Sequence, residues 1–78
     1  MRIRAQIGDN NDPNYSRMAY AVVDDDLWNK YKGLDEDNDD AYWTKRSEYW
    51  NRLCTAMSRQ NRLPVDWYVE EDFEEAEQ

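Results

Sequence analysis

The chain has 78 residues, of which 18 are acidic, 10 are basic and none is histidine, and its net charge at pH 7 is −8. This length supports a single small domain. Without histidine there is no imidazole base, no imidazole metal ligand and no nucleophile paired with histidine, so we expect no enzyme. No apolar run approaches the roughly 18 residues of a membrane-spanning helix. The first residues also lack an apolar signal core, so the sequence predicts a cytoplasmic protein.

Two strands are predicted at the start of the chain. From Arg2 to Ile7, apolar and polar residues alternate with the period of a half-buried strand. Residues Arg17 to Val23 form a second, more continuously apolar run, which is typical of a central or well-covered strand. Between them, Gly8 to Ser16 is rich in residues that favour bends, so we expect a nine-residue hairpin loop there.

A short helix is predicted next. Any of the three aspartates at 24–26 can cap a helix, and Gly33 is a typical stop signal. The apolar residues between them supply its buried side: Leu27, Trp28 and Tyr31. After Leu34, the acidic sequence DEDNDD at 35–40 is expected to connect this helix to the next one.

The longest element is a helix predicted from Asp39 to Arg62. On a helical wheel its large apolar residues fall within one arc about 160° wide, and they are Tyr42, Trp43, Tyr49, Trp50, Leu53, Cys54, Ala56 and Met57. Asp39 or Asp40 is the expected N-cap, and Pro64 disfavours helix at the residue before it. Because the chain has few other large groups to bury, we expect this stripe to lie in the core.

A third strand is expected from Val65 to Val69, where apolar residues again alternate. The order strand, strand, short helix, long helix, strand predicts an α+β fold, in which the long helix covers one face of a three-stranded antiparallel sheet. We expect residues 1–69 to form this domain. Residues 70–78 are expected to be an acidic tail, frayed or helical, with Phe73 as its one apolar anchor.

The acidic sequence at 35–40 begins like a calcium-binding EF-hand loop, but the pattern then fails. The sixth position requires Gly and holds Asp40, and the twelfth requires a bidentate Glu and holds Arg46. We therefore expect a solvated loop, with no metal or cofactor. Cys54 is the single cysteine, so it cannot form an internal disulfide, and we expect it to be a small core residue.

The acidic residues are concentrated in two blocks. Residues 24–40 contain eight acids against two lysines, and residues 66–78 contain seven acids and no base, whereas residues 41–65 carry five bases against one acid. Acidic residues keep small proteins soluble, and charge runs are usually solvated. Blocks this dense exceed what solubility requires, and like charges four residues apart disfavour a helix. The blocks therefore favour contact with a positively charged partner.

Carboxylates three or four residues apart on a helix, with Cβ atoms about 5–6 Å apart, form a row of charge comparable in density to one DNA strand, which carries one phosphate per about 3.4 Å of helix axis. We therefore predict that the acidic blocks occupy a Lys/Arg groove built for nucleic acid, with nearby tryptophans as anchors. The net charge argues against direct binding of nucleic acid. The predicted partner-binding residues are Asp24, Asp25, Asp26, Trp28, Asp35, Glu36, Asp37, Trp67, Glu70, Glu71, Asp72, Glu74 and Glu75.

In its small size, acidity, aromatic content and lack of catalytic motifs, the chain resembles phage-encoded DNA-mimic inhibitors of the anti-CRISPR type. This resemblance is one of composition and matches no family motif. It implies a non-catalytic inhibitor in the cytoplasm of a bacterial host that blocks the nucleic-acid groove of a nuclease or a CRISPR surveillance complex. The basic face of the long helix departs from a uniformly acidic mimic, with Lys45, Arg52, Arg59 and Arg62.

Two other functions remain open at this level. One is a protein-interaction adaptor that uses exposed aromatic residues, with the acids serving solubility. The other is an acidic metal-binding or regulatory protein. The sequence leaves the choice between monomer and homodimer open.

Overall fold

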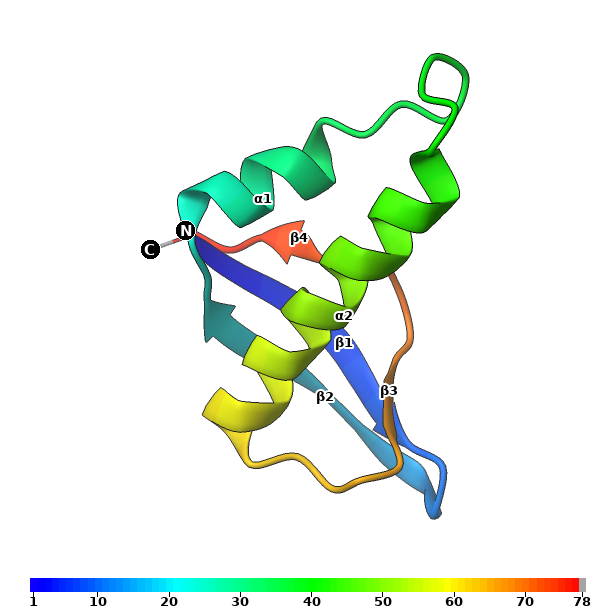
Figure 1. Cartoon of the computed structure of the whole chain (residues 1–78). Coiled ribbons are helices and arrows are strands. Elements are labelled where there is room, and N and C mark those ends of the chain that lie inside the picture. Colours follow the sequence, from blue (N-terminus) through cyan, green and yellow to red (C-terminus); the bar gives the residue numbers. More distant parts are fainter. Residues whose placement is uncertain (78) are drawn as a thin grey trace.

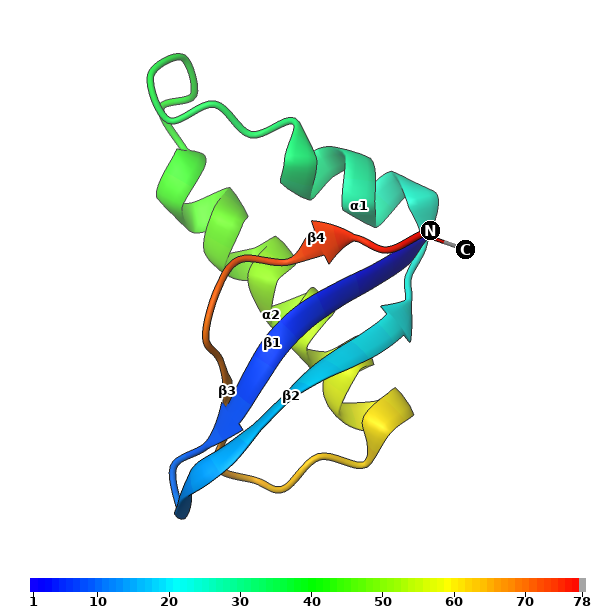
Figure 2. The same ribbon diagram turned by 180° about the vertical axis from the view of Figure 1, so that it is seen from behind.

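The computed structural model describes residues 1–77 and has an α+β fold with two helices and one antiparallel sheet of four strands (Figure 1). Both helices lie on one face of the sheet, as the views from the two sides show (Figure 2). The predicted α+β class and antiparallel sheet are therefore confirmed, whereas the predicted number of strands is wrong. The elements are β1, Arg2–Asp9; β2, Asp12–Val22; α1, Asp25–Lys32; α2, Tyr42–Asn61; β3, Trp67–Val69; and β4, Glu74–Glu75.

β1 is the centre of the sheet. β2 pairs with it from Arg2 opposite Val22 to Gly8 opposite Ser16, and after a break in register Asp9 lies opposite Asp12, so residues 13–15 have no partner on β1. β3 and β4 share the other side of β1, where Val69 lies opposite Ile7 and Glu75 lies opposite Ile3. On β1, Ile3 and Ile7 are four residues apart, whereas their partners Glu75 and Val69 are six residues apart. The residues between β3 and β4 therefore bulge out of the ladder.

The first connection is much shorter than predicted. Asp9 pairs with Asp12, so Asn10 and Asn11 alone make the turn, and β2 already includes Pro13. Of the two positions that its apolar run predicted, central or well covered, β2 has only the second, because it is an edge strand whose Ala19 and Ala21 are buried with residues of α2. Proline is tolerated in edge strands because one side of the strand needs no amide donors. The bend-forming residues thus belong mostly to a strand and not to a loop.

The C-terminal region is neither frayed nor helical up to Glu77, so that prediction is wrong. β4 pairs with β1, and the amide of Ala76 donates to the carbonyl of Arg2 at 2.9 Å. Phe73 and Ala76 are buried. The ring of Phe73 packs edge-on against Trp50, with the centroids 4.8 Å apart. Residues 70–77 therefore complete both the sheet and the core.

The core lies where α2 crosses the sheet. Leu53 and Met57 are fully buried among Ile3, Ala5, Ile7, Ala19 and Ala21 of β1 and β2. The stripe predicted for the long helix is confirmed at most positions, because Tyr49, Trp50, Cys54 and Ala56 pack partly buried against this core. Trp43 is the exception: it lies in the first turn of α2 and is 66% exposed, so its predicted place in the core is wrong.

α1 begins and ends as predicted. Asp24 is its N-cap, and the carboxylate of Asp24 accepts a hydrogen bond from the amide of Asp26 at 2.8 Å. Gly33 closes the other end, where its amide donates to the carbonyl of Asn29 at 2.9 Å. Leu27 and Trp28 are the buried residues of this helix, which fixes α1 against the core.

Replacing Asp24 with Ala is expected to lower the free energy of unfolding by about 1 kcal/mol, because the amide of Asp26 then loses its acceptor. Asp24→Asn retains a side-chain oxygen and is the matched control, with most of the stability kept. Urea denaturation of both variants, followed by circular dichroism, measures the difference. Equal losses in the two variants would show that the negative charge, and not the cap, stabilises the helix.

α2 begins at Tyr42 and not at Asp39. Its N-cap is Ala41, without a side-chain cap, because the carboxylate of Asp39 accepts from the amide of Ala41 and not from the first turn. The helix ends before Arg62, which has a left-handed backbone with φ of 52°. Since Pro64 follows shortly afterwards, the end of this helix agrees with the prediction.

Side chains at the end of α2 cover part of the outer edge of β2. Gln60 bonds to both the amide and the carbonyl of Val22, at 2.8 and 2.7 Å, and Asn61 donates to the carbonyl of Tyr20 at 2.7 Å. An uncovered strand edge is a template for pairing with another chain. These two amides therefore satisfy three backbone groups that would otherwise be available to another strand.

Candidate functional site

The predicted carboxylates lie in three separate places, and the structure gives each place a different character. One group is at the start of α1, one is in the loop between α1 and α2, and one is in β4 and the segment that leads into it. All the acidic residues of the predicted set are exposed. Their exposure agrees with a contact surface, but the number of ion pairs that they form differs from group to group.

The acidic loop, which we define as residues 35–37, lies at the far end of α1 and extends away from the sheet (Figure 1). Its backbone is held by local bonds, because the carboxylate of Asp35 accepts from the amide of Asp37 at 3.0 Å and the carbonyl of Asp35 accepts from the amide of Asp39 at 3.0 Å. Within the described part of the chain, Asp35, Glu36 and Asp37 form no ion pair. Their charges are therefore uncompensated and in defined positions.

The carboxylates at the start of α1 are partly occupied. Asp24 caps the helix, and Asp25 lies 2.7 Å from the amino group of Met1. Asp26 is exposed and forms no ion pair with residues 1–77. This group therefore offers less free charge than its three consecutive aspartates suggest.

Three of the C-terminal carboxylates fold back onto cations. Asp72 pairs with Arg46 at 2.8 Å, Glu74 with Arg4 at 3.3 Å and Glu75 with Lys32 at 2.6 Å. By contrast, Glu70 and Glu71 have no ion pair among residues 1–77. The sequence could not reveal these pairs, because each joins residues that are far apart along the chain. They reduce the negative charge that this segment presents to a partner.

Two carboxylates are held in the charged form by their partners. A hydrogen bond from Lys32, supported by one from the indole of Trp28, lowers the pKa of Glu75. The amide of Ala41, supported by Lys45, lowers the pKa of Asp39. A lowered pKa favours the carboxylate form in the folded protein. Both groups therefore stabilise the fold at pH values above their ordinary pKa, and this contribution is lost as the pH falls through the lowered pKa.

Of the two tryptophans predicted to contact a partner, one is in a position that contradicts the prediction. Trp28 is only 3% exposed, and its indole donates to Glu75 at 3.0 Å, so its predicted place at the surface is wrong. Trp67 is half-buried. The exposed large aromatic residues are instead Tyr20, Trp43 and Tyr68, at 40%, 66% and 41%. Tyr68 lies across Gly8, where a Cβ atom would stand 2.6 Å from its ring, so the glycine makes room for that ring.

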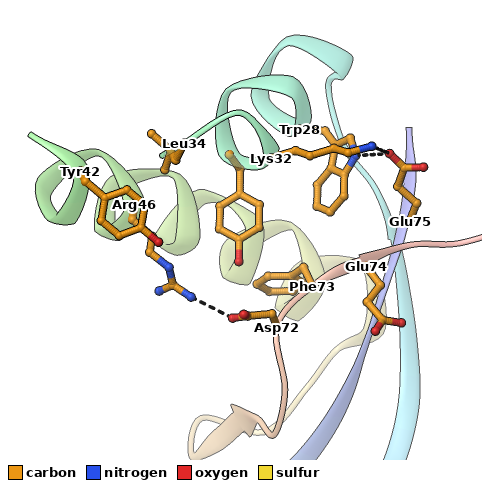
Figure 3. Close-up of a pocket in the computed structure, with 10 residues that line it drawn as sticks. Trp28, Lys32, Leu34, Tyr42, Arg46, Asp72, Phe73, Glu74 and Glu75 are labelled. Carbon is orange, nitrogen blue, oxygen red and sulfur yellow. Dashed lines mark hydrogen bonds and ion pairs between the residues drawn. The ribbon is translucent and has the colours of Figure 1, made fainter. Parts of the chain in front are cut away.

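An aromatic cleft lies between α1, the start of α2 and residues 72–75, which include β4 (Figure 3). Its volume is about 420 Å³, and its lining is Trp28, Tyr31, Lys32, Leu34, Tyr42, Arg46, Asp72, Phe73, Glu74 and Glu75. Burial, reinforced by the charge of Asp72, raises the pKa of Tyr31 to about 12. The phenol therefore stays neutral at all physiological pH values. The sequence did not reveal this cleft, because three distant segments build it.

Cys54 is half-buried against the core, and burial raises the pKa of its thiol to about 11. Since the thiolate is the reactive form, we expect Cys54 in the folded protein to react with Ellman's reagent at least about tenfold more slowly than in urea. Absorbance measured at about pH 8, close to the ordinary thiol pKa, tests this. Equal rates with and without urea would show that the thiol is open to solvent.

No helix among residues 1–77 combines the length and apolar character needed to cross a membrane. Within the same range, no three His, Cys, Asp or Glu side chains are grouped so that they could hold a metal ion. Comparisons with protein-family models, curated proteins and solved structures found no match. The proposals below are therefore based on the residues and geometry of this chain.

Proposed function

We propose that the chain is a non-catalytic inhibitor that binds a basic nucleic-acid-binding protein, such as a bacterial nuclease or defence complex, and blocks its nucleic-acid groove. The observation that carries the proposal is the acidic loop, in which Asp35, Glu36 and Asp37 are exposed and form no ion pair with residues 1–77. Uncompensated charge on a projecting loop steers a positively charged partner toward it.

The rest of the charge distribution supports a contact centred on this loop. Asp26 at the start of α1 and Glu70 and Glu71 before β4 also lack ion pairs within residues 1–77. The carboxylates of Asp72, Glu74 and Glu75 contribute less, because their cations remain beside them. We therefore assign the acidic loop the main role and the C-terminal segment a secondary one.

Part of the basic face of α2 is used within the fold. Lys45 of this face pairs with Asp39 at 3.2 Å, and Arg46, which lies outside the face, pairs with Asp72. Arg52, Arg59 and Arg62 form no ion pair with the described residues. These three arginines lie on or just beyond α2, and we propose that they remain outside the contact with a basic partner.

The experiment is capture of a partner from a bacterial lysate on immobilised protein, with elution by salt. Binding is expected at about 50 mM salt and loss at about 500 mM, since exposed charges are screened. The captured protein should bind nucleic acid, and duplex DNA should displace it from the immobilised chain. A captured protein that DNA does not displace, or that binds no nucleic acid, would contradict the proposal.

The matched variants keep the shape of the side chains and remove charge. Asp35→Asn, Glu36→Gln and Asp37→Asn together are expected to reduce the association rate at low salt by about tenfold or more, because steering depends on these charges. Asp12→Asn, Glu48→Gln and Glu77→Gln remove the same number of charges from exposed residues outside the loop. If the association rate falls by the same factor in both triple variants, the effect reflects net charge and not the position of the loop.

A second function has one observation in its favour, namely an adaptor that binds protein through the uncovered face of the sheet. Cross-strand neighbours share a face, and Tyr20 lies opposite Arg4 on the side away from the buried Ile3. The exposed apolar residues on this face are Met18, Tyr20, Val22 and Tyr68. An adaptor of this kind should bind with little salt dependence and lose affinity when Tyr20 or Tyr68 becomes Ala.

A further inference from the structure

The aromatic cleft has two properties that together select a ligand. Its walls are apolar and aromatic, supplied by Trp28, Tyr31, Leu34, Tyr42 and Phe73. Its volume of about 420 Å³ lies within the range of sites that hold small groups. A cleft of this kind accommodates a long side chain whose body is apolar and whose end is polar.

The charged groups around the cleft determine which polar end of such a side chain can bind. Three carboxylates line it, and each lies beside one cation: Asp72 beside Arg46, Glu75 beside Lys32, and Glu74 beside Arg4, which is outside the lining. Figure 3 shows the carboxylate of Asp72 facing Arg46, and that of Glu75 facing Lys32 and Trp28. In both acids only one oxygen is used: within residues 1–77, Asp72 Oδ2 and Glu75 Oε2 accept no hydrogen bond. A carboxylate has about four acceptor sites, so both acids retain capacity for a further cationic donor.

The chain already binds one guanidinium in the same way. The guanidinium carbon of Arg46 stands 5.0 Å from the ring centre of Trp50 and 6.0 Å from that of Tyr31. The same guanidinium pairs with Asp72 at 2.8 Å. Aromatic faces and a carboxylate thus hold an arginine beside the cleft, which is the combination that binds cations in aromatic sites.

We propose that the aromatic cleft receives an arginine side chain of the basic partner, with its stem against the aromatic walls and its guanidinium at the free oxygen of Glu75. Arginine is favoured over lysine because its planar guanidinium stacks on aromatic rings and is more weakly hydrated than an ammonium group. This inference rests on the proposed function, since a basic protein supplies the arginine.

The test uses N-acetyl-glycyl-arginyl-glycinamide as the probe and its citrulline analogue, which has the same shape without the charge, as the control. Both are titrated into isotope-labelled protein and followed by NMR. The arginine peptide is expected to shift the indole N–H signal of Trp28 and the amide signals of residues 72–75 in a saturable manner. The citrulline peptide is expected to shift them at least about tenfold more weakly at equal concentration.

Two variants test the walls and the acids separately. Tyr42→Ala and Glu75→Gln are each expected to weaken binding of the arginine peptide by about tenfold. Trp43→Ala and Glu71→Gln are the matched controls, because both residues are exposed and lie outside the cleft lining, and they should leave binding unchanged. The NMR spectrum of each variant without peptide reports whether it is folded.

Each outcome decides the inference. Equal binding of the citrulline peptide would mean that the cleft takes an apolar segment, and equal losses in the control variants would mean that the peptide follows net charge. Both results, like the absence of any saturable shift, overturn the inference. If the captured partner is still displaced by DNA in any of these cases, the proposed function stands and only the arginine site fails.

Discussion

Replacing Phe73 with Ala is expected to lower the free energy of unfolding by about 3–5 kcal/mol. Phe73 is only 5% exposed, and it joins the C-terminal segment to Trp50 of α2 and, at 6.4 Å between ring centres, to Tyr31 of α1. Small domains have little stability to spare. A loss of this size would leave a large fraction of the molecules unfolded at room temperature. Urea denaturation followed by tryptophan fluorescence measures it.

The matched control for Phe73 is Glu71→Ala. Glu71 lies in the same bulged segment, but it is exposed and has no ion pair with residues 1–77. Its replacement should change the free energy of unfolding by no more than about 0.5 kcal/mol. If Phe73→Ala proved as mild as this control, the C-terminal segment would not belong to the core.

Trp28→Ala is expected to have an effect of the same size, about 3–5 kcal/mol, because it empties a buried site beneath α1. It also removes the indole donor of Glu75. Trp28→Phe keeps most of the ring volume and loses the hydrogen bond, so a cost of about 1–3 kcal/mol is expected. Thermal unfolding of both variants gives the comparison.

This prediction affects how binding experiments are interpreted. If Trp28 were a surface anchor, Trp28→Ala would weaken partner binding and leave stability unchanged. With the indole buried, the variant should lose stability first, and any loss of binding should follow the unfolded fraction. Trp43→Ala is the corresponding test of an exposed indole, and it should cost little stability. A fully stable Trp28→Ala variant would refute the position of this residue.

The elements with a clear period were predictable. The alternation of β1, the stripe around Leu53 and Met57 and the cap at Asp24 each follow from local physical rules, and each is present. The early hairpin was not predictable, because residues such as Pro13 that favour bends are also tolerated in an edge strand. Only pairing with β1 shows that β2 continues to Asp12.

The C-terminal region was predicted wrongly for a related reason. Phe73 and Ala76 are both buried but three residues apart, which does not fit the alternation of a strand. Phe73 lies in the bulge between β3 and β4 and packs toward the helices. Its burial therefore depends on how this segment pairs with β1, which a local sequence pattern does not show.

The candidate site was predictable only in part. The exposure of residues 35–37 follows from their composition, since such a segment has nothing to bury. The burial of Trp28 and the exposure of Trp43 could not be foreseen, because both lie close to acidic residues in the sequence and only the packing of the helices decides which indole is covered. Likewise, the partners of Asp72 and Glu75 lie 26 and 43 residues away, beyond any local pattern.

The most direct test of the role of the acidic loop is the salt dependence of binding to the captured partner. The affinities of the unmodified protein and of the Asp35→Asn, Glu36→Gln, Asp37→Asn variant are measured from about 50 to 500 mM salt. The proposal predicts a steep fall of affinity with salt for the unmodified protein and a clearly shallower fall for the variant. Identical slopes would contradict it, because the loop carboxylates would then take no part in the contact.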